Sequence, residues 1–588
     1  MSMMSRSPAN SSYTSISAPN LPTTGGIFFL VDGSPLRPSS SMRSELIDKT
    51  PVYMRKSNRM LSGPVRVRQI SVWSACAWFA WAALPALAAR PVLAQSQRCE
   101  ELNRLSLPGI AVRSATPVSG AFGASGMAPR PVPEFCRVVG TVLPELGFEL
   151  WLPAHWNHKY VGVGNGGLAG KIVFAAMFNP VNRGYAVSST DTGHVATSAN
   201  DASWALGHLD RVLNYGQRGV HEMALASKAI IQAYYSAAPA HSYFQGCSFG
   251  GQQALTEVQR YPNDFDGVVA GDPANWYTRH YTGGHIWIAD AVEGDGWLPP
   301  HKVQMLADVV NAACDVLDGV KDGVLNDPRR CHFDPALLQC KAGDSPSCLT
   351  GAQVAAVRKI WAGPRDAGGE QLYPGLEPGG EAGPGGWVQW VTGPAPEQGA
   401  HIELGLPFMR NVVFDNPQWN FRTFHFDPPA PGRESDVTYV DDKVGRIFNA
   451  VDPDLRAFRA HGGKLIQYHG WSDPDIPPFN SINYYESVVR RAGRNNTNAL
   501  HDTREFYRLF MVPGMQHCTG GPGTPRFDAL TALEQWVEQN KAPDQIVASH
   551  ATNNLIDRTR PLCAYPQEAK YKGSGSTDDA ANFVCALP

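Results

Sequence analysis

The stretch that decides the fold is Tyr243-Phe-Gln-Gly-Cys-Ser-Phe-Gly-Gly-Gln-Gln-Ala254, in which an apolar, strand-like run leads into a serine between glycines. Gly246-Cys-Ser248-Phe-Gly250 matches Gly-x-Ser-x-Gly, and a helix-like segment follows at 252–260. Glycines allow a turn too sharp for larger side chains, and such a turn between strand and helix lifts the serine hydroxyl above a sheet. The stretch therefore predicts Ser248 as a nucleophile, although the five-residue pattern alone also arises by chance in Gly-rich chains.

Strand-like and helix-like segments alternate on both sides of this stretch. Apolar runs typical of strands occupy residues 148–152, 160–163, 185–188, 243–245 and 267–271, with helix-period segments at 220–235 and 252–260. The pattern resumes near the C-terminus, with strands at 464–468 and 505–512 and helices at 482–491 and 527–538. Such alternation predicts an α/β fold, a mostly parallel sheet with helices on both faces.

Residues 275–458, between these two halves, have a different composition. Gly, Pro and Trp become frequent, four cysteines cluster, and residues 381–387, Glu-Ala-Gly-Pro-Gly-Gly-Trp, are typical of a loop. We expect a lid domain here, inserted into a catalytic domain that consists of residues 95–274 and 459–588. The alternative is an irregular excursion that only covers surface, although structureless loops of this length are uncommon.

The first 94 residues are expected to lie outside these domains. Residues 1–59 are rich in Ser, Pro, Met and Arg and have no hydrophobic periodicity. A secretory signal is predicted within 60–94, because Arg66-Val-Arg68 precedes an apolar run at 70–89 and the small-residue exit Val92-Leu-Ala94 follows. The apolar run could instead span a bilayer as a single anchor. The signal predicts a secreted or periplasmic protein without stable membrane association.

Length and charge exclude some classes of protein. The 588 residues carry a formal net charge of −3 and contain no Lys/Arg block. A chain of this size buries at least one large core. Nucleic acid and anionic membrane surfaces are not expected as partners, because neither is attracted by a mildly acidic surface.

The eleven cysteines support export, because ten remain once Cys76 leaves with the signal, and an even number favours full pairing. Ten cysteines allow many connectivities. Short-range neighbours suggest the pairs Cys99–Cys136, Cys314–Cys331, Cys340–Cys348 and Cys563–Cys585. Pairing these eight leaves Cys247 and Cys518.

A serine nucleophile needs a base, and the base needs a carboxylate that orients it. With this serine motif the three residues occur in the order Ser, Asp, His, each on a loop after a strand. Asp473 follows the strand near Tyr468 and is predicted as the acid, with Asp475 as its competitor. His517 follows the strand that ends near Val512 and is predicted as the base.

The two remaining cysteines flank the predicted nucleophile and base. Cys247 directly precedes Ser248, and Cys518 directly follows His517. A disulfide between them would bind the nucleophile loop to the base loop, since disulfide Cα atoms lie about 5.5 Å apart, a distance that suits neighbours of two hydrogen-bonding side chains. The alternative is an ordinary staple that falls there by chance.

These motifs together resemble one family. The pairs Cys247-Ser248 and His517-Cys518, with His469-Gly-Trp-Ser-Asp473 between them, resemble the tannase and feruloyl esterase family, which also contains a hydrolase of mono(2-hydroxyethyl) terephthalate. The resemblance extends from about residue 99 to 585. It implies an α/β-hydrolase fold with an inserted lid, Ser248, Asp473 and His517 as the triad, and Cys247–Cys518 as the linking disulfide. It also supports the five pairs suggested by spacing.

Two backbone N–H groups are needed to stabilise the oxyanion of the reaction. One is expected from Phe249, the residue after the nucleophile, and the other from the Gly-rich loop 164–170. The resemblance favours Gly167, with Gly166 as the next candidate. A plain tight turn is the alternative for this loop.

An acidic loop at 314–327, Cys-Asp-Val-Leu-Asp-Gly-Val-Lys-Asp-Gly-Val-Leu-Asn-Asp, is a candidate metal site. Carboxylates among glycines suit Ca²⁺ rather than zinc. The spacing is not that of an EF-hand, so a solvated acidic loop is the alternative. The resemblance implies a structural Ca²⁺ held by the carboxylates of Asp315, Asp318 and Asp322 and by the carbonyl oxygens of Val320 and Val324.

The sequence thus predicts an exported serine ester hydrolase for small aromatic acid esters, feruloyl or galloyl, with no organic cofactor. Two or three aromatic residues of the insert would contact the substrate, from the set Trp276, Tyr277, Trp287, Trp361, Trp387, Trp390, Phe408, Trp419 and Phe421. Terephthalate monoester hydrolysis is the alternative activity, with Arg410 or Arg422 as the carboxylate partner. A non-catalytic calcium-binding module is the alternative from another class.

Overall fold

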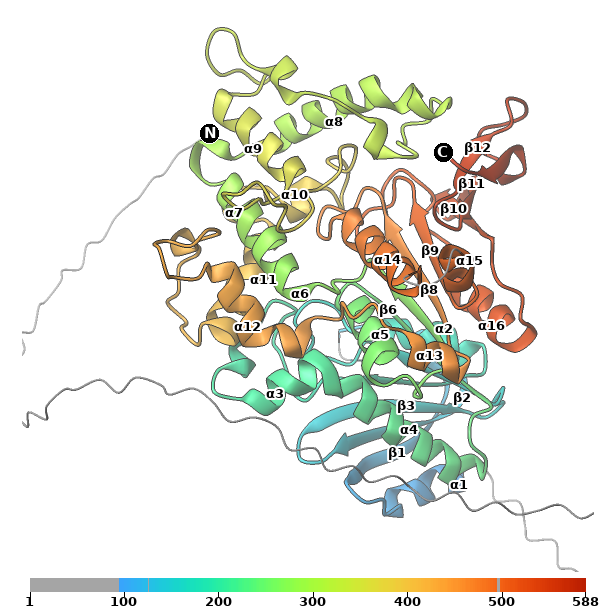
Figure 1. Ribbon diagram of the computed structural model, residues 1–588. Helices are drawn as coiled ribbons and strands as arrows, with labels where there is room; N and C mark the ends of the chain where they lie inside the picture. Colours follow the sequence, from blue (N-terminus) through green and yellow to red (C-terminus); the bar gives the residue numbers. More distant parts are fainter. Residues whose placement is uncertain (1–94, 125, 494–497) are drawn as a thin grey trace, which may run out of the picture. The chain divides into compact units, whose positions relative to one another are not determined.

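A mixed sheet is the centre of the fold in the computed structural model, which describes residues 95–588 except 125 and 494–497 (Figure 1). Within these residues the sheet has nine strands in the order β1-β2-β3-β5-β4-β6-β7-β8-β9. Their bounds are β1 Ile110–Phe122, β2 Arg130–Val142, β3 Leu146–Pro153, β4 Lys159–Val163, β5 Ala186–Thr190, β6 His241–Cys247, β7 Gly267–Gly271, β8 Lys464–Gly470 and β9 Tyr507–Val512. Neighbours from β5 to β9 are parallel, which confirms the predicted α/β sheet.

The parallel strands were predictable because they are buried on both faces. Every residue of β7 and β9 is buried, and so are four of the five residues of β4. Strands of this kind are short apolar runs that stand out in a sequence. The antiparallel strands β1 and β2 alternate irregularly between exposed and buried positions, so their pattern is weaker, and neither was predicted.

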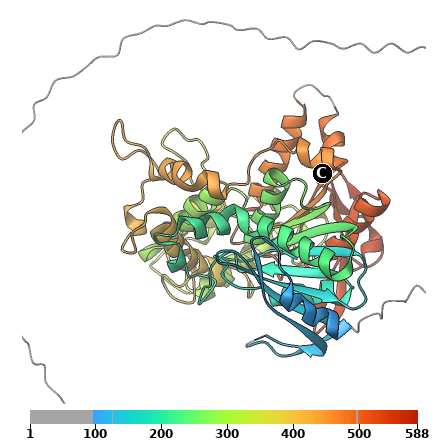
Figure 2. The same cartoon turned by 90° about the horizontal axis from the view of Figure 1, so that it is seen from below.

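Helices cover both faces of the sheet (Figures 1 and 2). One face packs against α1 Gln95–Glu101, α4 Gly219–Tyr235, α5 Phe249–Arg260, α13 Arg456–His461 and α14 Pro478–Ala492. The other face packs against α2 Phe174–Asn182 and α16 Ala529–Gln539, whose Leu530, Leu533 and Trp536 are buried together with Val269 of β7. An apolar layer therefore packs on each face of the sheet, and the loops at the ends of its strands extend from this packed core.

The chain leaves the sheet after β7 and returns at β8. The helices of this excursion are α6 Tyr277–Arg279, α7 Trp287–Ala291, α8 Pro300–Cys314, α9 Gly351–Ala362, α10 Trp387–Trp390, α11 Ala400–Phe408 and α12 Asp436–Phe448. It has an apolar core of its own, which includes Leu298, Leu306 and Trp387. A further cluster joins Tyr277 and Phe408 to Phe249 at the start of α5, so the insert packs over the carboxyl end of β6. The division into catalytic and lid domains stays a prediction.

Residues after β9 add two hairpins that were not predicted. The helices α15 Ala499–Arg504 and α16 flank β9 in the sequence, and β10 Gln545–Thr552 pairs with β11 Leu555–Cys563. β12 Glu568–Tyr571 then pairs with β13 Phe583–Ala586. The short helix α3 Leu209–Leu213 precedes α4.

All five suggested disulfides are present: Cys99–Cys136, Cys247–Cys518, Cys314–Cys331, Cys340–Cys348 and Cys563–Cys585. This arrangement confirms the pairing expected from spacing and resemblance. Among the described residues, no helix has both the length and the apolar character that a membrane span needs. The predicted signal at 60–94 and the preceding extension, 1–59, lie outside the described residues.

Candidate active site

Ser248 occupies a strained turn between β6 and α5. Its backbone angles are φ 64° and ψ −123°, a conformation that residues with side chains rarely adopt. The Ser248 N–H donates to the carbonyl of Gly271 at 3.0 Å, which holds the turn against the end of β7. A Cβ on Gly246 would lie 2.4 Å from the carbonyl oxygen of Gly250, so this turn requires glycine. Ser248 therefore has the backbone that the sequence motif predicts.

The Gly-rich loop 164–170 is fixed directly to this turn. A Cβ on Gly164 would lie 2.8 Å from the Cα of Gly250. The Asn165 N–H donates to Gln253 Oε1 at 2.9 Å, and Gln253 Nε2 donates back to Asn165 Oδ1 at 3.1 Å, with both side chains buried. The N–H of Phe249 begins α5, so it has no acceptor within that helix. The start of the loop that contains Gly167 is thus held beside the N-terminus of α5.

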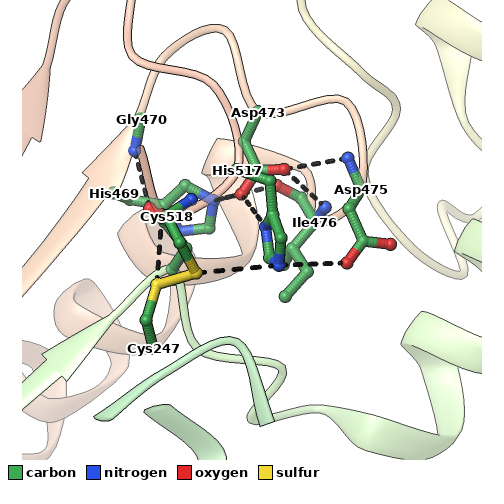
Figure 3. Close-up of a disulfide and its surroundings, with 9 residues drawn as sticks. Cys247, His469, Gly470, Asp473, Asp475, Ile476, His517 and Cys518 are labelled. Carbon is green, nitrogen blue, oxygen red and sulfur yellow. Dashed lines mark hydrogen bonds and ion pairs between the residues drawn. A yellow bond between two sulfur atoms is a disulfide. The ribbon is translucent and has the colours of Figure 1, made fainter. Parts of the chain in front are cut away.

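His517 and Asp473 form a close pair (Figure 3). His517 Nδ1 lies 2.9 Å from Asp473 Oδ2. Asp473 Oδ1 accepts the backbone N–H groups of Asp475 at 2.8 Å and Ile476 at 3.0 Å, which orients the carboxylate. Burial opposes the charge on Asp473, but His517 and His469 outweigh burial and hold the pKa of this carboxyl below its ordinary range. This geometry favours Asp473 as the orienting acid.

Asp475 lies on the opposite side of the imidazole. Its Oδ2 is 3.4 Å from His517 Nε2, the nitrogen that a serine would use. Burial raises the pKa of Asp475 to about 7. Burial by itself would lower the pKa of His517, but the charges of Asp473 and Asp475 outweigh burial and raise it to about 10. His517 therefore lies between two carboxylates, one near each ring nitrogen.

The disulfide that joins the two loops is supported by a residue that was not predicted. The Cα atoms of Cys247 and Cys518 are 5.9 Å apart, and the two cysteines are separated by 271 residues. Asp272, directly after β7, accepts the Cys518 N–H at 2.6 Å and the Gly470 N–H at 2.8 Å. Burial raises the pKa of Asp272 to about 6. Its position at the carboxyl end of a parallel strand was the signal that could have identified it.

Removal of this disulfide in a Cys247→Ala/Cys518→Ala variant is expected to lower stability and activity together. A loop of 271 residues corresponds to about 5.6 kcal/mol on the chain-entropy model, as an upper limit. The catalytic rate constant should fall about 10- to 100-fold, since only hydrogen bonds would then hold the two loops in register. Thermal melting and kcat measured well below Tm would check both effects. The matched control is Cys340→Ala/Cys348→Ala, which opens a loop with a separation of 8 residues, corresponds to about 2.5 kcal/mol and should leave kcat unchanged.

Aromatic rings surround the base and the residue after the serine. The Trp390 ring lies 4.9 Å from the His517 ring, edge to face. Phe249 stacks on Tyr215 at 4.2 Å, and Tyr277 approaches Phe249 at 5.6 Å. The structure thus brings Trp390 and Tyr277 of the predicted aromatic set to the site, whereas Trp387 lies in the core of the insert. Tyr215 was not predicted, because it precedes the serine motif by more than thirty residues without any local pattern.

The acidic loop brings its three carboxylates close to the backbone of one turn. Asp315 Oδ1 accepts the N–H groups of Asp322 at 3.2 Å and Gly323 at 2.9 Å, and Asp318 Oδ1 accepts the Val320 N–H at 2.9 Å. Burial and the neighbouring carboxylates raise the pKa of Asp318 to about 6. Arg560 pairs with Asp322 at 2.6 Å. Arg558 also lies 3.7 Å from Asp322, so two arginines offset part of the charge of the three carboxylates. Oxygen donors of this kind are those that a hard cation such as Ca²⁺ takes.

Most of this chain is similar to known proteins. Residues 131–586 match the family model described as tannase and feruloyl esterase. The chain belongs to this family. It is 41% identical to an uncharacterized esterase of Xanthomonas campestris over 83% of this chain and 91% of that protein. It is 32% identical to the mono(2-hydroxyethyl) terephthalate hydrolase of Piscinibacter sakaiensis, over 81% of this chain and 87% of the relative.

A solved structure shows the same architecture. Feruloyl esterase B from Aspergillus oryzae superposes with a TM-score of 0.75 at 27% identity, covering 84% of this chain and 100% of that chain. These findings confirm the family and the α/β-hydrolase fold expected from the motifs. They also establish this protein as a carboxylic ester hydrolase.

Proposed function

We propose that this esterase is an exported serine hydrolase that cleaves esters of aromatic acids, feruloyl or galloyl, through an acyl-enzyme. Ser248 attacks the ester carbonyl, His517 accepts its proton and returns it to the leaving alcohol, and Asp473 orients the imidazole. The N–H groups of Phe249 and Gly167 bind the oxyanion, and water then releases the acid. The observation that carries this proposal is the Cys247–Cys518 disulfide, which joins the turn of Ser248 to the loop of the His517–Asp473 pair.

An aromatic acyl group is favoured by the rings around the site. Trp390 is half-buried and offers an apolar ring beside the base, and such rings bind phenolic groups well. Phe249 is buried against Tyr215 and Tyr277, so it supports the wall beside the nucleophile from within. The terephthalate alternative needs a cation for the second carboxylate. Arg422 is exposed and pairs with Glu293 and Glu397, and Arg410 Nε donates to the Trp419 carbonyl at 2.8 Å. The guanidinium of Arg422 is therefore paired with carboxylates away from the His517–Asp473 pair, and that of Arg410 is tethered through Nε, which favours an uncharged phenolic ring.

Export is supported by the disulfides. Five bridges within the described residues are typical of an oxidising compartment, because cytosolic thiols are kept reduced. The proposed location is therefore the periplasm or the extracellular medium.

Turnover on three substrates tests the proposed activity. Values of kcat/KM for methyl ferulate, methyl gallate and mono(2-hydroxyethyl) terephthalate are expected to be at least about 10-fold higher for one of the two phenolic esters than for the terephthalate monoester, since each lost polar or ionic partner costs about 1–3 kcal/mol. A higher value for the terephthalate monoester would assign the alternative activity. No turnover on any ester by folded protein would support the non-catalytic alternative.

We further propose that the acidic loop holds one structural Ca²⁺ through Asp315, Asp318 and Asp322, with the carbonyls of Val320 and Val324. The bound ion would neutralise the buried carboxylates and clamp the loop that follows α8. Chelation is expected to lower Tm by several degrees, because a ligand that binds only the folded chain stabilises it by mass action. Activity measured well below Tm should stay unchanged. Differential scanning calorimetry before and after chelation, with Ca²⁺ then added back, checks this prediction, and a Tm that Ca²⁺ does not raise would contradict it.

A further inference from the structure

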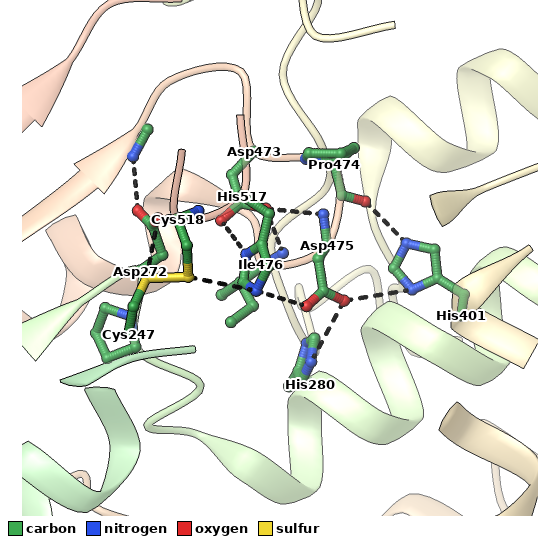
Figure 4. A network of polar contacts seen from close by, with 12 residues as sticks. Cys247, Asp272, His280, His401, Asp473, Pro474, Asp475, Ile476, His517 and Cys518 are labelled. Atoms are coloured by element: carbon green, nitrogen blue, oxygen red, sulfur yellow. Dashed lines mark hydrogen bonds and ion pairs between the residues drawn. A yellow bond between two sulfur atoms is a disulfide. The ribbon is translucent and has the colours of Figure 1, made fainter. Parts of the chain in front are cut away.

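Buried histidines gather around Asp475, on the side that faces away from His517 (Figure 4). His280 and His285 come from η4 His280–Ile286, and His401 comes from α11. All three side chains and Asp475 belong to residues that are at most 3% exposed. Burying several histidines together is costly unless their ring nitrogen atoms have partners, because these polar atoms lose their hydrogen bonds to water.

The local backbone explains why two of these rings face each other. The segment η4 is a π-helix, with i→i+5 hydrogen bonds, so its turn aligns residues five apart. His280 and His285 are five apart, and their Nε2 atoms lie 3.0 Å from each other. In an α-helix the same two residues would point in different directions. Short π segments are frequent at functional sites, since their longer turn is less stable than an α-turn.

The third donor of this group is Asp475 Oδ1. It lies 3.7 Å from His280 Nε2 and 3.9 Å from His285 Nε2. With the nitrogen pair at 3.0 Å, the point equidistant from all three atoms is about 2.1 Å from each, which is the length of a bond from zinc to nitrogen or oxygen (about 2.0–2.2 Å).

Binding of a cation would replace one hydrogen bond within the group, the contact between the two Nε2 atoms. His285 Nδ1 lies 2.9 Å from the His401 carbonyl, so it carries the proton and Nε2 keeps its lone pair. Asp475 Oδ1 is buried and accepts no hydrogen bond from the described residues, and His280 Nδ1 is likewise unpartnered there. Coordination would move the His280 proton from Nε2 to Nδ1. Burial and the neighbouring rings hold the pKa of His280 and His285 well below the ordinary value, and a neutral imidazole is the form that binds metals.

We propose that His280, His285 and Asp475 form a binding site for Zn²⁺ or a related late first-row dication. Two imidazoles and one carboxylate are a common donor set for such ions. The cation would fasten η4 of the insert to the loop that carries Asp473 and Asp475. This site is separate from the acidic loop, whose oxygen donors suit Ca²⁺.

Metal content of the whole protein tests the proposal. The chain is produced in zinc-supplemented medium, desalted, and analysed for zinc and calcium by mass spectrometry. About one zinc per chain is expected for the wild type and for the control His461→Gln, an exposed histidine on α13. His280→Gln and His285→Gln should each retain less than about a fifth of that zinc, with calcium unchanged.

A spectroscopic measurement covers the case in which these variants fail to fold. Wild-type protein produced with Co²⁺ in place of zinc should show the visible absorption of a bound cobalt ion, and X-ray absorption should show two imidazole ligands. Folded wild type without zinc or cobalt would overturn the proposal. Retention of the metal by a folded His280→Gln/His285→Gln double variant would overturn it equally.

Discussion

Ser248→Ala is expected to lower kcat/KM on aromatic esters by about 10⁴-fold or more. The Ser248 hydroxyl is the attacking atom of the proposed mechanism, and what remains without it is the oxyanion site and substrate binding. Stability should change little, because the side chain is small and the turn is held by backbone groups such as the bond from the Ser248 N–H to Gly271. Steady-state kinetics on methyl ferulate together with a melting curve measure both quantities.

The matched control for this variant is Ser487→Ala. Ser487 is half-buried on α14, where its hydroxyl donates to the Tyr484 carbonyl at 2.6 Å. Ser487→Ala also deletes a serine hydroxyl, but at a position that does not contact the candidate active site. Activity should therefore stay within about twofold of the wild type. Comparable turnover by Ser248→Ala and the control would refute the serine mechanism and leave the family assignment intact.

Asp473→Asn is expected to lower kcat by about 10⁴-fold. The asparagine side chain can present an N–H group to His517 Nδ1, which favours the wrong tautomer of the imidazole and leaves Nε2 protonated. The Asn carbonyl can still accept the N–H groups of Asp475 and Ile476, so the loop should keep its conformation. Single-turnover kinetics would separate this loss from any change in substrate binding.

The comparison with Asp475→Asn decides between the two candidate acids. Asp475 faces Nε2 rather than Nδ1 of His517 and cannot hold the productive tautomer. Its replacement is therefore expected to cost at least about 100-fold less in kcat than Asp473→Asn. A larger loss in Asp475→Asn would transfer the orienting role to that residue.

The strands that carry the site could be predicted because their signals are local. Strands β4, β7 and β9 are short and buried, so each is an apolar run with turn residues on either side. The antiparallel strand β1 and the C-terminal hairpins have one exposed face and an irregular pattern, and the sequence contained no comparable signal for them. Local burial decides how clearly a strand can be seen in a sequence.

The histidine cluster could not be predicted for a different reason. His280 and His285 are five residues apart in the sequence, a spacing that matches neither the α-helical nor the strand period. The π-helix is what brings their two rings together. His401 lies 116 residues from His285 in the sequence. The approach of such distant residues depends on how the insert folds back onto the sheet, which no short-range pattern encodes.

The sequence by itself determined the turn of Ser248, the parallel strands around it and the cysteines that flank the serine and the histidine, because glycine geometry and burial act over a few residues. It left Asp473 and Asp475 as competing acids. Only the tertiary structure placed one carboxylate on each nitrogen of His517, and it added Asp272 behind the disulfide. Two aspartates two residues apart are equivalent in a sequence, and only the packing of neighbouring loops makes their environments different.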